Sequence, residues 1–181
     1  QAVDGVWITN SGFNGTTGMN IIVDGTFVTN IMCNGVIIDG TAEYGIIIGG
    51  STGAGGNFQF NNGHIDLQSG NGWTGIGNAV LISSTVYDDI QFNGGYIMGT
   101  WQADGVYIAR TGAKAITFNG VRIADNNRGN SVGIAGINCL DAVTGVRVIG
   151  CTFYNISAGH QKYGINTQGT LQALINSCSF V

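Results

Sequence analysis

The chain of 181 residues carries only ten acidic side chains, so its possible acid–base groups can be considered one by one. His64 and Asp66 stand two residues apart, and Asp125 ends a similar phrase further along the chain. Two carboxyl groups that flank a glycosidic bond can cleave it, one as the acid and the other as the base or nucleophile. We therefore rank Asp66 and Asp125 first as a catalytic pair, with His64 tuning Asp66.

Three further acidic groups are candidates of lower rank. Asp88 and Asp89 are adjacent, and neighbouring carboxylates repel each other, which suits acid–base work, although such a pair is also a turn signal. Glu43 is the only glutamate of the chain and lies beside Tyr44 at the start of an expected strand. We keep these three residues as alternative catalytic groups.

Aromatic and basic side chains supply candidate binding groups. Tyr96 and Arg122 follow His64 in one predicted surface column, where Arg122 could hold a carboxylate or a hydroxyl of a ligand. The other aromatic candidates, which could stack on a sugar ring or simply cover the protein surface, are Trp73, Trp101 and Tyr107. The cysteines and the glycine-rich segments lack metal-binding or phosphate-binding spacing, so we expect no metal and no cofactor.

A repeated unit must position these side chains, because one eight-residue phrase recurs along the chain. Its copies are Ile21–Val28, Phe58–Ile65, Ile90–Ile97, Ile116–Ile123, Val146–Phe153 and Ala173–Phe180. The third residues of successive copies are 37, 32, 26, 30 and 27 residues apart. These intervals are typical of solenoid coils with loop insertions, the longest of them expected between Val28 and Phe58 and between Ile65 and Val80.

A second phrase precedes each copy, so each coil holds at least two short strands. Its copies are Gly5–Ile8, Gly45–Ile48, Ala79–Ile82, Gly105–Ile108, Gly133–Gly136 and Gly164–Thr167. Alternation predicts inward Val106 and Ile108 around an outward Tyr107. Asn-Gly between apolar runs usually marks a hairpin, but stacked hairpins turn about every 8–12 residues, more often than here. We predict an all-β, single-stranded right-handed parallel β-helix of about six coils, with a β-sandwich as the alternative.

The coil register also assigns columns of side chains that run along the solenoid. The corner column is Asp24, Asn61, Asn93, Asn119, Ile149 and Asn176. Its amides can hydrogen-bond from coil to coil, which is a structural role. The outward column of the other strand is Trp7, Ile47, Leu81, Tyr107, Ala135 and Asn166. Burial against neighbouring subunits around a threefold axis explains its apolar members most economically, and a sugar-binding face is the second explanation.

Composition narrows the possible function classes. The chain has 44% hydrophobic residues, 32 glycines, no proline and a net charge of -4. Charged residues make up only 9%, against about 25% in an average soluble domain. The absence of a Lys/Arg run argues against a nucleic-acid binder, and the apolar runs are too short for a membrane span. We therefore expect neither nucleic acid nor membrane as a partner.

The phrases Val146–Asn155 and Asp104–Ile108 resemble the pectate-lyase-like superfamily of right-handed β-helices, and most closely the bacteriophage tailspikes. The resemblance covers nearly the whole chain and is specific for fold rather than for activity. It implies a homotrimer of the virion tail that binds, and usually cleaves, a bacterial surface polysaccharide such as capsule or O-antigen. A bacterial protein of this kind would be secreted or on the cell surface. The catalytic Arg and the calcium-binding Asp cluster of pectate lyases are not matched, so no catalytic residue is carried over.

Two functions follow, one enzymatic and one not. The first is a polysaccharide depolymerase, a glycoside hydrolase or a lyase, that uses Asp66 and Asp125 with Arg122 as a substrate clamp. The alternative is a non-catalytic shaft or receptor-binding segment of a phage tail fibre or a bacterial adhesin. Because both ends of the sequence lack a polar cap, we predict that residues 1–181 form one β-helix domain, a fragment of a longer tailspike-like chain.

Overall fold

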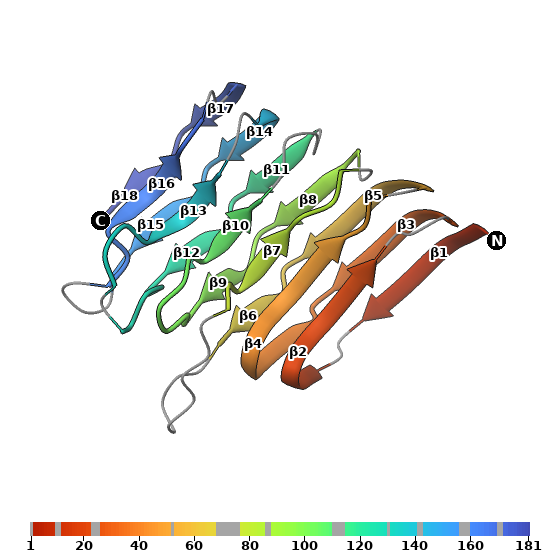
Figure 1. Cartoon of the computed structure of the whole chain (residues 1–181), viewed down its shortest axis with the longest axis horizontal. Coiled ribbons are helices and arrows are strands. Elements are labelled where there is room, and N and C mark those ends of the chain that lie inside the picture. The colour runs from red at the N-terminus through yellow and green to blue at the C-terminus, as the bar shows by residue number, and fades with distance from the viewer. Residues whose placement is uncertain are drawn as a thin grey trace.

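The computed structural model describes residues 2–9, 12–22, 26–51, 53–67, 77–85, 88–109, 115–129, 131–140, 143–155, 160–169 and 172–181. All regular elements in these ranges are β-strands, and all their pairings are parallel. Figure 1 shows the strands stacked in chain order from the N-terminus to the C-terminus. The predicted parallel β-solenoid is therefore confirmed.

The solenoid has three faces. The first is a sheet of β1 (Ala2–Thr9), β3 (Thr26–Asn34), β5 (Gly53–Asn61), β8 (Ile90–Asn93), β11 (Ile116–Asn119), β14 (Thr144–Ile149) and β17 (Gln172–Asn176). The second contains β2 (Gly12–Ile22), β4 (Ile37–Gly49), β7 (Val80–Ile82), β10 (Val106–Ile108), β13 (Ala135–Cys139) and β16 (Tyr163–Thr167). The third contains β6 (His64–Asp66), β9 (Tyr96–Met98), β12 (Arg122–Ala124), β15 (Thr152–Tyr154) and β18 (Ser179–Phe180). The long strand β4 bends between the second and third faces, since it pairs with both β7 and β6.

The first two coils lie in a different register from the predicted one. Cys33 pairs with Phe60, so the corner phrase of this coil is Ile31–Ile38 and not Ile21–Val28. The phrase before it is Val6–Phe13, since Ile8 pairs with Cys33. The sequence Asp24-Gly25 resembles the Asn-Gly of a corner. Only the strand pairing distinguishes the two possible registers. The prediction of a long loop insertion between Val28 and Phe58 is therefore wrong, because this stretch contains ordinary strands of the solenoid.

The outward column of the second face also has a different register from the predicted one. Ile137 pairs with Val106, so Asn138 and not Ala135 lies beside Tyr107. Ala135 is fully buried. At the other end of the column, Trp7 belongs to the first face, where it pairs with Met32. The residue that pairs with Ile47 is Asn20. The apolar stripe therefore shrinks to Ile47, Leu81 and Tyr107, all partly exposed.

The interior is apolar, as the alternation predicts. Val106, Ile108, Ile116, Phe118 and Ile123 are fully buried, whereas the outward Tyr107 is half-buried and Arg122 is exposed. Phenylalanine rings form a column inside the first face. The ring of Phe92 stacks on that of Phe118 with centroids 5.2 Å apart, and it also contacts the rings of Phe58 and Phe60. Burial of these rings contributes to stability.

The corner between the first and third faces is built from an amide ladder. The Nδ2 group of Asn61 donates to Oδ1 of Asn34 at 2.8 Å, and Nδ2 of Asn93 donates to Oδ1 of Asn61 at 2.9 Å. The residue after each corner position has a left-handed backbone, with φ of 60° at Gly35, 50° at Asn62 and 65° at Gly94. Glycine and asparagine tolerate this conformation, which explains the repeated Asn-Gly. The predicted corner residue Asp24 lies outside the described residues.

A second column of polar side chains joins the connection 99–105 to the next coil through hydrogen bonds. The carboxylate of Asp104 accepts hydrogen bonds from the backbone N–H of Ala135 at 2.7 Å and from Nδ2 of Asn138 at 2.9 Å. Nδ2 of Asn166 in turn donates to Oδ1 of Asn138 at 3.1 Å. Asp104 is buried, and this burial raises the pKa of its carboxyl group.

Replacing Phe92 with alanine tests the packed column of rings. Phe92 is only 1% exposed, so the substitution removes its contacts and leaves a cavity. We expect the free energy of unfolding to fall by about 3–5 kcal/mol, measured by urea denaturation. The matched control is Thr117→Ala on the outer side of β11, for which a change within about 0.5 kcal/mol is expected. Equal effects of the two substitutions would contradict the inward assignment.

Asp104 makes stability depend on pH in a defined direction. Because its pKa is raised in the folded state, folding favours the protonated carboxyl group. This contribution is complete below the unfolded pKa of about 3.9 and is lost as pH rises through the folded pKa. Between about pH 3 and pH 7, wild type should therefore lose stability relative to Asp104→Asn. Parallel curves for the two proteins in denaturant titrations would contradict this assignment.

Candidate functional site

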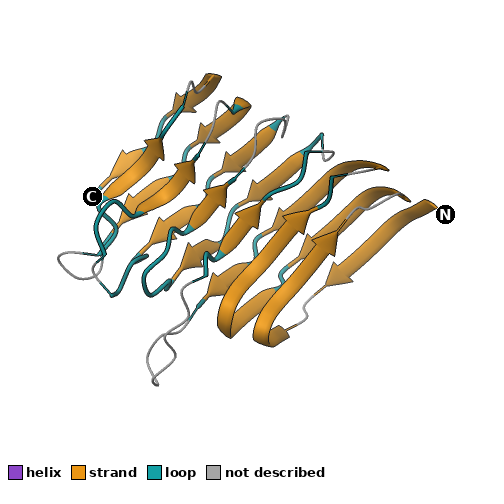
Figure 2. Ribbon diagram, viewed as in Figure 1, coloured by secondary structure: helices purple, strands orange, loops and turns teal. Residues whose placement is uncertain are grey.

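Connections from third-face strands start along one edge of the solenoid, and their described residues are 67, 77–79, 99–105, 125–129, 131–134, 155 and 160–162. Figure 2 shows loops between the strand ends along the lower edge of the view. Every one of these connections begins at the end of a third-face strand, so side chains from successive coils are brought to the same edge. The candidate site lies there.

Asp66 is the last residue of β6 and points to the outer side of the sheet, because its neighbour Ile65 is fully buried inside. It is nevertheless only 8% exposed, which the sequence did not suggest. Its carboxylate lies over Gly99 of the next coil, where a Cβ atom would approach Oδ1 to 2.0 Å. Gly99 also has a φ of 86°, so glycine is required there for two reasons.

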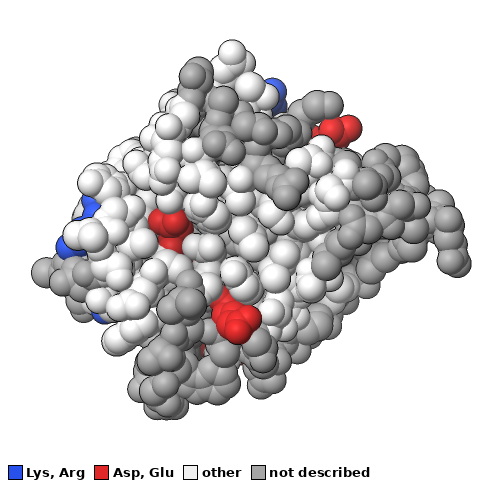
Figure 3. Space-filling model, in the orientation of Figure 1, with Lys and Arg blue, Asp and Glu red and all other residues white. Residues whose placement is uncertain are grey.

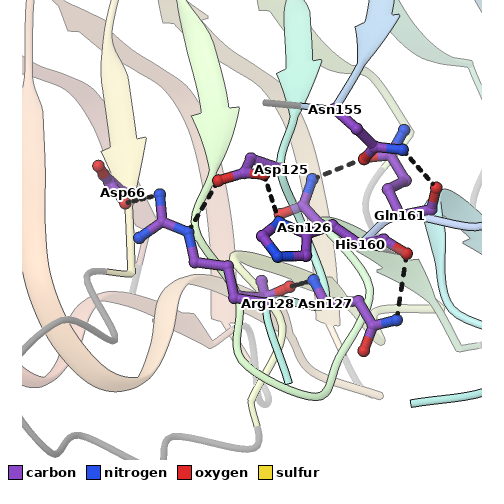
Figure 4. Close-up of polar contacts among 9 residues, drawn as sticks. Asp66, Asp125, Asn126, Asn127, Arg128, Asn155, His160 and Gln161 are labelled. Atoms are coloured by element: carbon purple, nitrogen blue, oxygen red, sulfur yellow. Dashed lines mark hydrogen bonds and ion pairs between the residues drawn. The ribbon is translucent and has the colours of Figure 1, made fainter. Parts of the chain in front are cut away.

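Asp125 follows β12, two coils after Asp66, and is 5% exposed. Nε of Arg128 donates to Oδ2 of Asp125 at 3.0 Å, and Nη2 of Arg128 lies 4.0 Å from Oδ1 of Asp66. Nδ1 of His160 contacts Oδ1 of Asp125 at 2.5 Å. Figure 4 shows the Arg128 guanidinium between the two carboxylates and His160 beyond Asp125. The structure thus brings the predicted pair to one cluster and adds Arg128 and His160, which sequence reasoning missed.

The backbone around Asp125 is held in an unusual conformation. Asp125 and Asn127 both have left-handed φ angles, of 50° and 68°. The N–H of Asn127 donates to Oγ1 of Thr100 at 2.9 Å, and that of Arg128 donates to the Thr100 carbonyl at 2.9 Å. Nδ2 of Asn127 donates to the carbonyls of Ser131 and His160. These bonds join three connections and fix Arg128 and His160 on either side of Asp125.

Side-chain amides hold the residue that follows His160. Nδ2 of Asn126 donates to Oε1 of Gln161 at 3.1 Å, and Nδ2 of Asn155 donates to the carbonyl of Gln161 at 2.9 Å. Asn126 is fully buried, and its Oδ1 atom has no hydrogen-bond partner. The position of Gln161, directly after His160, is therefore fixed by two neighbouring segments.

Asp66 differs electrostatically from an ordinary surface carboxylate. Burial raises its pKa, and Arg128 and His64 lower it by less, whereas Asp39 and Asp125 raise it further. Oδ1 of Asp66 and Nε2 of His64 are both buried without a hydrogen-bond partner. Buried polar atoms of this kind are uncommon and call for an explanation. A carboxyl group that retains its proton in a polar cluster can act as a general acid.

The predicted column His64, Tyr96 and Arg122 is confirmed in position. Strand pairing places His64 beside Tyr96 and Tyr96 beside Arg122. The rings of His64 and Tyr96 lie 5.5 Å apart. The Arg122 guanidinium sits 5.1 Å from the centre of the Tyr96 ring, and its Nη1 donates to the tyrosine hydroxyl at 2.6 Å. This column lies on the third face, two residues along the strands from the Asp66 position.

The other predicted site residues are dispersed. Asp88 and Asp89 precede β8 at a different edge, and both oxygens of Asp89 accept from Nε2 of Gln91. Glu43 is exposed on β4, where that strand bends toward the second face. Trp101 lies in connection 99–105, and its carbonyl accepts a hydrogen bond from Gly129. Tyr107 is on the second face, and Trp73 lies outside the described residues.

Other kinds of chemistry find little support in the described part of the chain. No group of three or more His, Cys, Asp or Glu residues there could hold a metal ion. All four cysteines are free, and burial raises the pKa of Cys33, Cys139 and Cys151 to about 11, which disfavours nucleophilic thiolates. Among the described residues, charged side chains are few and widely spaced on the face drawn in Figure 3. No helix among the described residues is long and apolar enough to cross a membrane.

Comparisons with family models, with curated proteins and with solved structures gave no match to this chain. Its function must therefore be argued from the geometry of the cluster and of the neighbouring column.

Replacing Arg128 with alanine tests the cluster without any substrate. The substitution removes a charged hydrogen bond from Asp125, so the free energy of unfolding should fall by about 1.5–3 kcal/mol. The pKa of Asp66 should also rise, since Arg128 lowers it. Carboxyl-carbon NMR measures the second effect. The control is Arg122→Ala on the exposed column, and an Asp66 pKa that responds equally to both substitutions would rule out the described contact.

Proposed function

We propose that the chain binds a bacterial surface polysaccharide along the third face and cleaves it at the edge where Asp66 and Asp125 meet. The observation that carries this proposal is the convergence of Asp66, Asp125, Arg128 and His160 from three coils onto one cluster. A stable scaffold needs no such charged cluster, because its apolar interior and backbone ladders suffice. Titratable groups in contrasting environments are typical of acid–base sites.

The exposed column is suited to hold the sugar chain beside this cluster. The Tyr96 ring, which lies between His64 and Arg122, offers an aromatic surface, and Arg122 offers a cation that forms no ion pair with an acidic group of the described residues. Aromatic rings stack on the apolar faces of sugars, and a guanidinium can bind a carboxylate or hydroxyls. The column is two residues along the strand from Asp66, or about 7 Å. One sugar ring on Tyr96 would thus place the next linkage near the acid.

The spacing of the acidic residues favours hydrolysis with inversion. Their strands are two coils apart, which corresponds to about 9.5 Å. Both carboxylates turn toward Arg128, and a spacing of two coils is closer to the inverting range of about 6.5–9.5 Å than to the retaining range of about 5–5.5 Å. In this proposal Asp66 protonates the leaving oxygen, and a water is activated on the Asp125 side of the site.

The resemblance of the coil phrases to bacteriophage tailspikes supports a setting for this activity, namely a homotrimeric spike of the virion tail. In that setting, the stripe Ile47, Leu81 and Tyr107 is a candidate subunit contact. It is smaller than the sequence suggested, because Trp7 and Ala135 do not belong to it.

A non-catalytic role is the second candidate, and one observation favours it. Asp66 and Asp125 are buried, and Arg128 lies between them. A cluster of this kind could fix three connections of a structural shaft or receptor-binding segment without doing chemistry.

Incubation with a panel of bacterial capsules and O-antigens distinguishes the two roles. We expect new reducing ends without unsaturated uronates, and a loss of activity of about 10²–10⁴-fold in Asp66→Asn. Asp88→Asn, at a different edge, is the matched control and should keep its activity. Undiminished cleavage by Asp66→Asn would eliminate this site. A wild-type protein that binds a polysaccharide and leaves it intact would favour the shaft or receptor-binding role.

A further inference from the structure

We infer that His160 is the general base of the site and that Asp125 is the residue that orients it. This inference rests on the proposed function and changes the role that the sequence gave to Asp125, from an acid or base to a positioning residue.

Asp125 is poorly placed to activate a water itself. Its Oδ2 accepts from Arg128 at 3.0 Å, and its Oδ1 faces His160. Its backbone N–H donates to the Tyr154 carbonyl at 3.1 Å, which fixes the residue from behind. The Asp125 side chain is 6% exposed, against 17% for that of His160. With both oxygens engaged and less exposure than His160, the Asp125 carboxylate is less accessible to a water than the imidazole is.

His160 has the arrangement that a base requires. A carboxylate at Nδ1 favours the tautomer with the proton on Nδ1, which leaves Nε2 as the proton acceptor. The His160 carbonyl accepts from Asn127, and the following Gln161 is held by Asn126 and Asn155. The imidazole is therefore fixed at both its ring and its backbone.

Among the described residues, few charged groups surround His160. Asp125 faces its ring, Arg128 lies on the other side of Asp125, and Lys162 follows two residues later. Asp66 lies beyond Arg128. The segment 156–159 before His160 contains no titratable side chain. Asp125 is thus the group that contacts the imidazole directly.

The atoms and charges of the resulting hydrolysis step balance. Nε2 of His160 takes a proton from water as the water oxygen bonds to the anomeric carbon. The bond from that carbon to the glycosidic oxygen breaks, and its electron pair goes to the oxygen, which receives the proton of Asp66. The site is left with an imidazolium beside the Asp125 carboxylate and with an ionised Asp66. Proton exchange with solvent restores both groups.

Nitrogen NMR of the two histidines tests the orientation without any substrate. His64→Gln assigns the signals of His160. We expect neutral His160 to carry its proton on Nδ1 in wild type, and we expect this preference to disappear in Asp125→Asn. A proton on Nε2 in wild type, or a tautomer unaffected by Asp125→Asn, would overturn the positioning role.

Kinetic measurements on a polysaccharide that wild type cleaves test the role of His160 as the general base. His160→Gln should lower kcat by about 10²–10⁴-fold and remove the acidic limb of the pH profile. His160→Asn serves as a second variant, with thermal unfolding to confirm that both fold. Full activity of a folded His160 variant would refute the base role and leave the proposed function standing. If wild type itself cleaves nothing that it binds, the proposed function fails and the base role fails with it.

Discussion

Parallel hydrogen bonding between successive coils is the constraint on which the rest of this structure depends. Each coil lies about 4.8 Å from the next, so residues some thirty positions apart in sequence become neighbours in columns. The phenylalanine column, the asparagine ladder and the column of His64, Tyr96 and Arg122 are all consequences of this one register. The candidate site depends on it as well, because Asp66, Asp125 and His160 come from different coils of the third face and its connections.

Sequence reasoning succeeded where the coil repeats itself. Along most strands from β5 onward the apolar positions alternate with outward ones, and asparagines mark the same corner at the ends of β5, β8, β11 and β17, so both the fold and the column of Tyr96 and Arg122 could be predicted. It failed in the first coils, where Asp24-Gly25 has the appearance of a corner. It also failed at Ala135, where Gly133 has the appearance of the glycine that begins the strand phrase. In both cases two registers satisfy the same local pattern, and only pairing with the neighbouring coils decides between them.

The site could be predicted only in part, for a physical reason. Asp66 is the last residue of β6, where the repeat fixes its direction, and Asp125 directly follows β12. Arg128 and His160 lie in connections of irregular length, whose shape follows from left-handed residues and from hydrogen bonds to Thr100 and Asn127. A periodic sequence pattern carries no information about such contacts. The burial of both carboxylates was missed for the same reason, since connections from other coils cover them.

The central claim is that the coil register brings residues 35 positions apart, Asp125 and His160, into direct contact. A double-mutant cycle on unfolding free energy, with Asp125→Asn, His160→Gln and the double variant, tests this claim most directly. Contact predicts a coupling energy of about 0.5–3 kcal/mol between the two substitutions. Effects that add to within about 0.3 kcal/mol would show that the two side chains do not meet, and would contradict the register from which the site is derived.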